Sequence, residues 1–233
     1  MKKLVVLTGA GISAESGIST FRDSDGLWEH YRVEDVATPE GFARNPGMVL
    51  DFYNQRRRET LACKPNYGHV GLADLERYFE VDIITQNIDD LHERAGSSSV
   101  LHLHGEIMKA RSSKEEDIIV DLPADADIHL GDKAPDGTQL RPFIVWFGEA
   151  VPNITPAISL VEDAEIFLIV GTSLNVYPAA GLVRYVRRGV PIYLIDPKTV
   201  AVPNNENLTV FRTGATEGMK LFVAEMKTKY NLV

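Results

Sequence analysis

The chain has 233 residues, of which 44% are hydrophobic and 24% are charged, a balance that is ordinary for a folded globular protein. Its formal net charge of −9, with no block of Lys or Arg to offset it, argues against a nucleic-acid-binding protein. Cys63 is the only cysteine, which excludes an intramolecular disulfide and a zinc site built from cysteines. The first expected strand begins near residue 3, which leaves no room for a signal peptide, and no apolar run approaches the roughly 20 residues that span a bilayer. We therefore expect a cytoplasmic protein.

Apolar, β-branched runs alternate with helical patterns along most of the chain. Strands are expected at 3–8, 81–85, 100–103, 143–147, 166–170 and 191–195. Helices are expected at 47–62, 67–79, 155–163, 179–188 and 215–229. This alternation predicts an α/β fold, a Rossmann-like parallel sheet with helices on both faces.

Two segments interrupt this alternation. Residues 23–46 are aromatic and charged, and we expect a loop with short helical turns that folds over a ligand. Residues 111–141 are rich in charges and turn formers, with a possible short strand at 118–120, and predict a small inserted lobe. The alternative is a long surface excursion without a core of its own. The predicted division of the single domain, 1–233, gives a large part of 1–22, 81–110 and 142–233, and leaves the small lobe and ligand loop at 23–80 and 111–141.

Residues 9–22 follow directly on the first expected strand. Residues 9–14, Gly-Ala-Gly-Ile-Ser-Ala, have the spacing of a dinucleotide-binding turn, in which glycines allow a tight turn and a close approach to a pyrophosphate. Such a turn alone is a weak signal, because glycine turns after strands are common. The tail at 17–22, Gly-Ile-Ser-Thr-Phe-Arg, distinguishes it from a dehydrogenase, since the chain is expected to leave the helix for a loop there.

Polar clusters also follow two other expected strands. Asn87 and Asp89, after 81–85, could hold a carboxamide or a ribose, with an ordinary helix cap as an equal alternative. His102 and His104 share one face of the next strand. His104, beside Gly105 at the strand end, is the better position for a general base.

Three further groups of residues suggest binding. Residues 171–173, Gly-Thr-Ser, offer hydroxyls and amides to a ribose or phosphate, or form an ordinary turn. Residues 145–149, Val-Trp-Phe-Gly-Glu, could pair with an extended peptide or contribute core aromatics. Tyr53 and Arg56 lie three apart on one helix face, where a phenol beside a guanidinium would clamp a carboxylate unless the arginine is simply solvated.

Taken together and in this order, the motifs resemble the sirtuins, the NAD-consuming protein-lysine deacylases. The resemblance runs through 9–22, 85–89, His104-Gly105, 147–149, 171–173 and 177–180. It implies NAD as co-substrate, with His104, Asn87 and Asp89 as catalytic residues. The cofactor-binding residues that it implies are Gly9, Ala10, Gly11, Ile12, Ser13, Glu15, Thr20, Phe21, Arg22, Trp28, Gln86, Asn87, Ile88, Asp89, Gly171, Thr172, Ser173, Leu194, Ile195, Asp196 and Ala215. The substrate-binding residues that we predict are Tyr53, Arg56, Val145, Phe147, Gly148 and Glu149.

The chemistry that the resemblance implies is attack of an acyl oxygen on the nicotinamide-bearing ribose carbon, with loss of nicotinamide. His104 would then help to pass the acyl group to ribose, giving free lysine and O-acyl-ADP-ribose. Tyr53 with Arg56 is similar to the pair that marks the branch accepting succinyl- and malonyl-lysine, so we predict a preference for acidic acyl groups and weaker deacetylation. The expected partners are acyl-lysine proteins or peptides, with no nucleic acid and no membrane, and we expect a monomer.

The chain departs from the sirtuin pattern in two places. Sirtuins usually hold their small lobe with four cysteines around zinc, but here 111–113 is Arg-Ser-Ser and 131–141 contains no cysteine. We expect no metal and no zinc, and a lobe held by apolar packing among Ile118, Ile119, Val120, Leu122 and Ile128. At 194–196, Leu-Ile-Asp replaces a frequent Asn-x-Glu, which leaves the Asp196 carboxylate for the adenine ribose.

Three alternative functions stay open at this point. An NAD-dependent oxidoreductase would fit the glycine turn, but this chain lacks the acidic residue that such an enzyme has about 20 residues later. A mono-ADP-ribosyltransferase would use the same NAD and a similar cleft. A non-catalytic NAD-binding module is disfavoured by the presence of His104, Asn87 and Asp89.

Overall fold

The computed structural model describes residues 1–19, 31–203 and 206–232. Its elements, in chain order, are β1 (Lys2–Thr8), α1 (Ala10–Ala14), α2 (Val33–Val36), α3 (Pro39–Arg44), α4 (Pro46–Ala62), α5 (Tyr67–Leu75), β2 (Phe79–Thr85), α6 (Leu91–Arg94), β3 (Val100–His102), β4 (Gly105–Ser112), β5 (Ile119–Asp121), β6 (Leu140–Ile144), α7 (Ile154–Asp163), β7 (Ile166–Val170), the 3₁₀ helix η2 (Ala179–Tyr185), β8 (Ile192–Ile195), β9 (Leu208–Phe211) and α8 (Ala215–Tyr230).

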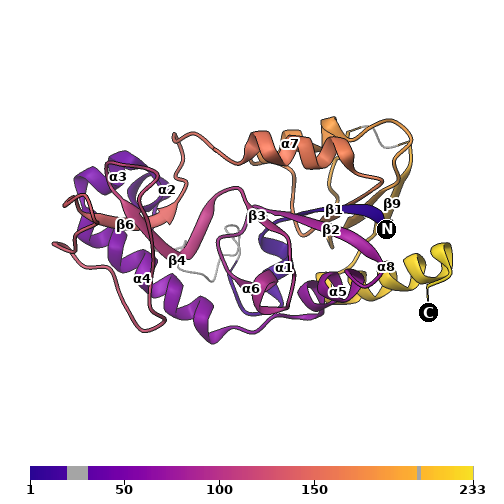
Figure 1. Cartoon of the computed structure of the whole chain (residues 1–233), viewed down its shortest axis with the longest axis horizontal. Coiled ribbons are helices and arrows are strands. Elements are labelled where there is room, and N and C mark those ends of the chain that lie inside the picture. Colours follow the sequence, from indigo (N-terminus) through magenta and orange to yellow (C-terminus); the bar gives the residue numbers. More distant parts are fainter. Residues whose placement is uncertain (20–30, 204–205, 233) are drawn as a thin grey trace.

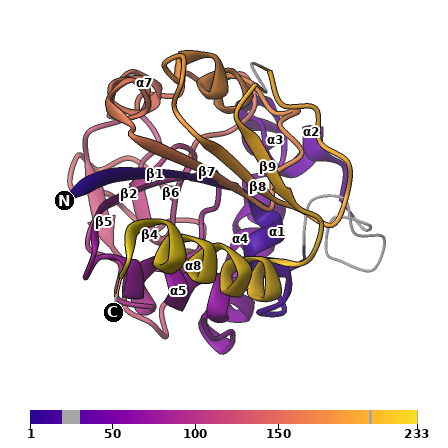
Figure 2. The same cartoon turned by 90° about the vertical axis from the view of Figure 1, so that its right-hand side faces the viewer.

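Six strands form one parallel sheet in the order β3-β2-β1-β7-β8-β9. Successive side chains of a strand point to opposite faces, and those of β1 therefore enter two separate cores. One core lies under α5 and α8, and the other lies under α7 and η2. Figure 2 shows α7 on one side of the sheet and α5 and α8 on the other. The predicted α/β fold with helices on both faces is confirmed.

The structure differs from the predicted elements in the strand expected at 143–147. That apolar run belongs to β6, which ends at Ile144 and pairs antiparallel with β4 in a second, three-stranded sheet, β5-β4-β6. An apolar run does not reveal the direction of its partner strand, which explains the error. The strands β4 and β9 were not predicted, because each is only partly buried and carries polar residues. The helix expected at 179–188 is the shorter η2, which contains Gly181, a poor helix former.

The second sheet and the helices α2, α3 and α4 form a smaller lobe at one end of the molecule (Figure 1). Its apolar core combines Phe52 and Tyr53 of α4 with Ile107 of β4 and Trp146. The short turns expected in 23–46 are present as α2 and α3, while residues 23–30 of that segment lie outside the described residues. Both β4 and β6 continue across the boundaries predicted at 110–111 and 141–142.

Apolar packing explains only part of how this lobe is held. Ile128 is buried against Leu50 of α4, as expected, and Leu122 packs at the edge of the same cluster. The expectation was wrong for Ile119, whose side chain is 45% exposed, because β5 is an edge strand and turns this residue to solvent. Other contacts must therefore contribute to the stability of the lobe.

One such contact is a polar cluster around Ser112, which is fully buried at the end of β4. Ser112 Oγ donates to Asp136 Oδ2 (2.6 Å) and lies 2.9 Å from Thr138 Oγ1. The same oxygen accepts the backbone N–H groups of Lys114 and Glu115, at 3.0 and 2.9 Å. These bonds join the end of β4 to the loop before β6. They connect the two stretches in which the sirtuin pattern has its cysteine pairs.

A second set of contacts runs from α4 to the segment 122–128. Asn54 Nδ2 donates to Ile128 O and Asn54 Oδ1 accepts the Ile128 N–H, both at 2.9 Å, so one buried amide satisfies both backbone groups. Arg57, also buried, donates to Pro123 O at 2.9 Å. Arg58 pairs with Asp127. Helix α4 therefore clamps a loop that has few regular backbone bonds of its own.

Candidate active site

The carboxyl ends of the parallel strands lie in one row at a single edge of the large sheet. Thr8 of β1 pairs in register with Thr85 of β2, which pairs with His102 of β3. On its other side Thr8 pairs with Val170 of β7. In open α/β sheets this edge is where ligands bind. The loops that follow β1, β2, β3 and β7, which carry most of the predicted site residues, therefore meet here.

The glycine turn after β1 rests directly on the turn after β7. Gly11 N donates to Gly171 O at 2.8 Å, and a Cβ added to Gly11 would come within 2.7 Å of Gly171 Cα. Gly171 itself has a φ of +62°, which favours glycine. The two glycines thus allow two loops of the site to touch, which is a requirement of the fold that precedes any contact with a ligand.

Ser13, Asn87 and Asp89 form a buried polar network just inside this edge. Asn87 Nδ2 donates to Ser13 Oγ (3.1 Å) and to the backbone of the β1–α1 turn, and Ser13 Oγ donates to Asp89 Oδ2 (3.0 Å). His69 of α5 accepts the Asn66 N–H at Nδ1, so its proton lies on Nε2, 3.3 Å from Ser13 Oγ. No described residue donates to Asn87 Oδ1, which leaves this acceptor available to a bound group.

Burial dominates the electrostatics of this network. It raises the pKa of Asp89, although the Leu91 N–H and the Ser13 hydroxyl partly oppose the shift. Burial lowers the pKa of His69 to about 4 and also depresses the pKa of His92, whose ring lies 4.9 Å from that of His69. Both imidazoles are therefore neutral at pH 7. The titratable group of this network whose pKa is raised is therefore Asp89, and the two imidazoles are uncharged.

His104 is placed as a general base. Its Nδ1 lies 2.9 Å from Gln86 O, and since a carbonyl only accepts, Nδ1 carries the proton and Nε2 keeps a lone pair. No hydrogen bond from another described residue occupies Nε2. Burial lowers the pKa of His104, so the ring is in its basic form at neutral pH.

The neighbouring His102 has a different environment. Its Nε2 lies 2.8 Å from a carboxylate oxygen of Glu93, and its Nδ1 lies 2.9 Å from Asn87 O. The Glu93 carboxylate more than offsets the effect of burial and raises the pKa of His102. Both nitrogens of His102 are occupied, whereas His104 has a free one. The geometry therefore favours His104 over His102 as the base.

The remaining predicted cofactor residues fall into four groups. Gln86 Nε2 donates to Thr172 Oγ1 at 3.0 Å, which joins two loops of the edge. The side chains of Ile12, Leu194 and Ile195 are fully buried in the sheet cores and offer a ligand only their backbone. Ala10, Ile88, Gly171, Ser173 and Ala215 lie in or beside these same loops, and Thr20, Phe21, Arg22 and Trp28 lie outside the described residues.

Two predicted acidic residues have protein partners. The Glu15 carboxylate accepts the Thr216 N–H at 3.2 Å and so caps the start of α8. A Cβ on Gly214 would come within 2.2 Å of that carboxylate, which explains the glycine there. Asp196 follows β8 and accepts the Lys198 N–H at 2.8 Å.

Tyr53 and Arg56 lie three residues apart on α4, and Tyr53 is buried in the apolar core of the small lobe. Burial lowers the pKa of Arg56, and the Glu59 and Asp89 carboxylates partly oppose that shift. The Arg56 guanidinium thus lies in the field of the carboxylate at the strand edge. Burial raises the pKa of Tyr53 to about 12, so its phenol stays protonated.

The residues predicted to bind a peptide have mixed environments. Val145 N donates to His104 O at 2.9 Å, and Phe147 N donates to Ala37 O at 2.9 Å with the Phe147 side chain 48% exposed. Gly148 has a φ of +93°. The Glu149 carboxylate points inward and accepts two bonds from Arg141, at 2.7 and 3.1 Å. Glu149 therefore organises the loop, and its side chain is already engaged.

Sequence reasoning missed His69, Arg141 and the role of Trp146. His69 is the third residue of α5 and forms a capping box with Asn66. This local role explains the histidine by itself, so the sequence did not indicate its second contact, with Ser13. Trp146 was weighed only as part of the 145–149 run. The partners of His69 and Trp146 across the site lie 56 and 93 residues away in the chain, so no local pattern could reveal them. Arg141 has its partners within eight residues, but nothing in the sequence indicated that its side chain turns inward to Glu149.

Residues 9–178 match the profile of the Sir2 family. The chain belongs to the Sir2 family, the sirtuins. It is 60% identical over 224 residues to an NAD-dependent protein deacylase of Bacteroides thetaiotaomicron, covering 94% of this chain and 96% of that relative. A Sir2 homologue solved as an NAD complex superposes with a TM-score of 0.89 at 40% identity, over 98% of this chain and 90% of the homologue. A mutant Sir2 homologue solved with 2′-O-acetyl ADP ribose gives 0.88 at 39% identity, over 98% and 93%.

This sirtuin differs from the metal-containing pattern of its family in the small lobe. With Cys63 as its only cysteine, it cannot build a four-thiolate zinc site. Across residues 1–19, 31–203 and 206–232, no group of three or more His, Cys, Asp or Glu side chains is arranged to hold a metal ion. In the same ranges, no helix combines the length and apolar character needed to cross a bilayer.

Proposed function

We propose that this sirtuin is an NAD-dependent protein-lysine deacylase that prefers succinyl- and malonyl-lysine and removes acetyl groups more slowly. The activity is supported by the family membership and by the named activity of its 60% identical relative. The acyl preference is the finer part of the proposal. It is supported by Tyr53 and Arg56 on one face of α4.

The site has the chemistry to hold NAD. The unused Asn87 Oδ1 can accept a carboxamide or ribose hydroxyl, and the Asp89 carboxylate beside it can accept another donor. Bound NAD would supply an electrophilic ribose carbon whose leaving group is nicotinamide. The Ser13 and His69 bonds fix the Asn87 amide and the Asp89 carboxylate in orientation before a ligand arrives. Such preorganisation lowers the cost of orienting the reactants.

His104 supplies the base. Its Nδ1–H is held on Gln86 O, so Nε2 faces away from that carbonyl with its lone pair available to a ribose hydroxyl. A base with this geometry removes the hydroxyl proton as the ribose oxygen attacks the acyl carbon. The lowered pKa of His104 keeps it unprotonated at neutral pH. Free lysine and O-acyl-ADP-ribose are the expected products.

The acyl preference follows from the strong pairing that an arginine makes with a carboxylate. An arginine remains protonated at all physiological pH values and binds a carboxylate with two parallel hydrogen bonds. A succinyl or malonyl tail supplies that carboxylate, whereas an acetyl group offers only a methyl. The Arg56 guanidinium therefore favours an acyl tail that ends in a carboxylate over an acetyl group.

Mass spectrometry of matched succinyl-, malonyl- and acetyl-lysine peptides incubated with NAD tests both parts. We expect nicotinamide and O-acyl-ADP-ribose in stoichiometric amounts, with faster turnover of the acidic peptides. His104→Tyr should abolish turnover and spare NAD binding, and Arg56→Met should remove the acidic preference. An Arg56→Met enzyme that desuccinylates as fast as wild type would contradict the preference. Transfer of ADP-ribose to the peptide, or formation of NADH, would replace the proposal with one of its rivals.

A further inference from the structure

Trp146 connects the small lobe to the acyl pair. Its indole is 98% buried, and its Nε1–H donates to Tyr53 Oη at 3.0 Å, although 93 residues separate the two in the chain. The rings lie 6.3 Å apart and are tilted by 36°. Among the described residues, no hydrogen bond joins this pair to the network around Asp89 or to His104.

The hydrogen bond from Trp146 determines how the Tyr53 hydroxyl can interact with a ligand. An indole N–H can only donate, so in this contact the phenol oxygen must accept. No described residue makes a second hydrogen bond to Tyr53, so its O–H is not donated to any of them. Burial keeps the phenol protonated. A phenol in this state has its O–H available to donate to a ligand.

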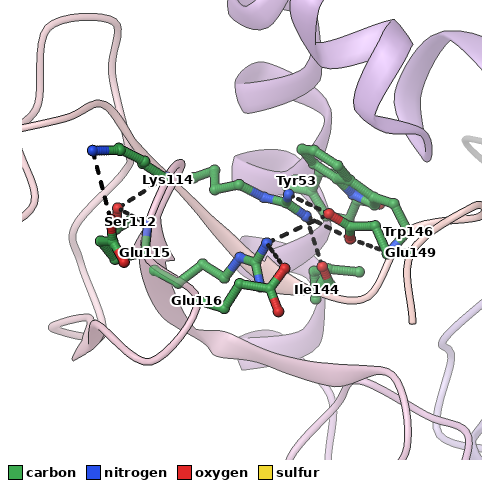
Figure 3. Close-up of polar contacts among 10 residues, drawn as sticks. Tyr53, Ser112, Lys114, Glu115, Glu116, Ile144, Trp146 and Glu149 are labelled. Atoms are coloured by element: carbon green, nitrogen blue, oxygen red, sulfur yellow. Dashed lines mark hydrogen bonds and ion pairs between the residues drawn. The ribbon is translucent and has the colours of Figure 1, made fainter. Parts of the chain in front are cut away.

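Trp146 is itself firmly held. The Arg141 guanidinium carbon lies 3.3 Å from the Trp146 ring centroid, close enough for a strong cation–π contact. Arg141 is fixed by the bidentate bond to Glu149 and by a 2.8 Å bond to Ile144 O. Glu149 also accepts the Trp146 backbone N–H at 2.8 Å. Figure 3 shows Trp146 and Glu149 gathered beside Tyr53, at the side of β4 and β6.

We infer that Trp146 is a specificity-determining positioning residue, which occupies the acceptor of Tyr53 and thereby directs its O–H to a hydrogen-bond acceptor on the acyl group. This rests on the proposed function, because it assumes that Tyr53 faces that group. The ligand that fits is an acyl tail ending in a carboxylate. A carboxylate accepts from the phenol and from Arg56 together, while a tail without an acceptor leaves the phenol proton without a partner on the substrate.

The substitution Trp146→Phe tests this, because it keeps an aromatic ring beside Arg141 and removes the indole N–H together with part of the ring volume. We expect the ratio of kcat/KM for succinyl- over acetyl-lysine peptide to fall about tenfold, mainly through a higher KM for the succinyl peptide. A tenfold change corresponds to about 1.4 kcal/mol. Tyr53→Phe should give a similar fall, and the double variant should be no worse than Tyr53→Phe alone, because the two residues act as a unit.

Phe42→Leu is the matched control for packing. The Phe42 ring lies 5.3 Å from that of Trp146 in the same core, so this variant should lower stability and leave the ratio unchanged. If Trp146→Phe does not fold, ¹⁵N-tryptophan spectra of wild type and Tyr53→Phe give a second measurement. The Trp146 indole N–H should be protected from solvent exchange in wild type and lose protection in Tyr53→Phe.

The outcomes separate this inference from the proposal beneath it. A wild-type enzyme with no preference for succinyl over acetyl overturns both. A wild type that prefers succinyl and loses the preference in Arg56→Met, while Trp146→Phe keeps the full wild-type ratio, overturns the inference alone. An indole N–H that exchanges equally fast in wild type and Tyr53→Phe does the same. Loss of the ratio in Trp146→Phe and its retention in Phe42→Leu support it.

Discussion

Replacing Asn54 by alanine removes the clamp between α4 and the small lobe. The substitution leaves the N–H and C=O of Ile128 buried without their partner, and each unsatisfied buried group costs about 1–3 kcal/mol. The sum is about 2–4 kcal/mol, after allowance for partial access of water. For a chain of this size each kcal/mol lowers the melting temperature by roughly 2–4 °C, so we expect a fall on the order of 8 °C.

Two assays check this prediction together. Thermal unfolding gives the total loss, and hydrogen–deuterium exchange of the peptide 122–130 shows whether the loss arises at Ile128. The control is Gln55→Ala on the same helix, whose side chain is exposed and bonds only Glu59, so it should change the melting temperature by less than about 1 °C. Asn54→Asp should fall between, because a carboxylate can accept from Ile128 N but cannot donate to Ile128 O.

The reasoning fails if Asn54→Ala melts within about 1 °C of wild type and exchange over 122–130 is unchanged. That result would mean that apolar packing around Ile128 holds the segment without the amide. A large fall in melting temperature with unchanged exchange at 122–130 would place the damage elsewhere in α4 and would also contradict the clamp.

Three further predictions concern the site and the lobe. Because burial lowers the pKa of His104, the acidic limb of the kcat/KM profile should have its midpoint below 6.5, and a midpoint above that value would argue against His104 as the base. His69 has a pKa of about 4 in the folded state and about 6.5 in the unfolded state, so the unfolded state binds protons first as pH falls. The free energy of unfolding should therefore decline by about 3 kcal/mol between pH 6.5 and 4. Unfolding titrations of His69→Gln should show a shallower decline, and an equal slope would refute the assignment. Ser112→Ala should cost about 1–3 kcal/mol by chemical unfolding, whereas Ser113→Ala, which keeps its backbone bond to Gln139, should be nearly neutral, and equal effects would contradict the cluster.

The sequence predicted the large sheet well because its central strands are buried on both faces. Runs such as 166–170 are continuously apolar, and this pattern is typical of parallel strands between two layers of helices. The same pattern failed for 143–147, where a similar run lies in an antiparallel sheet. It also missed β9, an edge strand with one exposed side, since half-buried strands mix polar with apolar residues.

The candidate site divides in the same way. The strand-end positions of Asn87, Asp89 and His104 followed from a general rule of parallel sheets, and the structure brings their loops to one edge. The contacts that orient the side chains of the site could not be predicted from the sequence. The bond from His69 to Ser13 spans 56 residues and the bond from Trp146 to Tyr53 spans 93, and each depends on how two layers pack.

The cluster around Ser112 affects how the small lobe responds to oxidants and to metal chelators. A lobe held by zinc thiolates opens when peroxide oxidises the sulfurs or when a chelator removes the metal. Hydroxyl, carboxylate and amide groups contain no sulfur to oxidise and hold no metal to remove. Their hydrogen bonds can reform after a local opening. The one thiol, Cys63, follows α4 outside this cluster, and burial raises its pKa, which makes it a poor nucleophile. We therefore expect the small lobe of this sirtuin to stay folded in the presence of oxidants or chelators that would open a zinc-thiolate lobe.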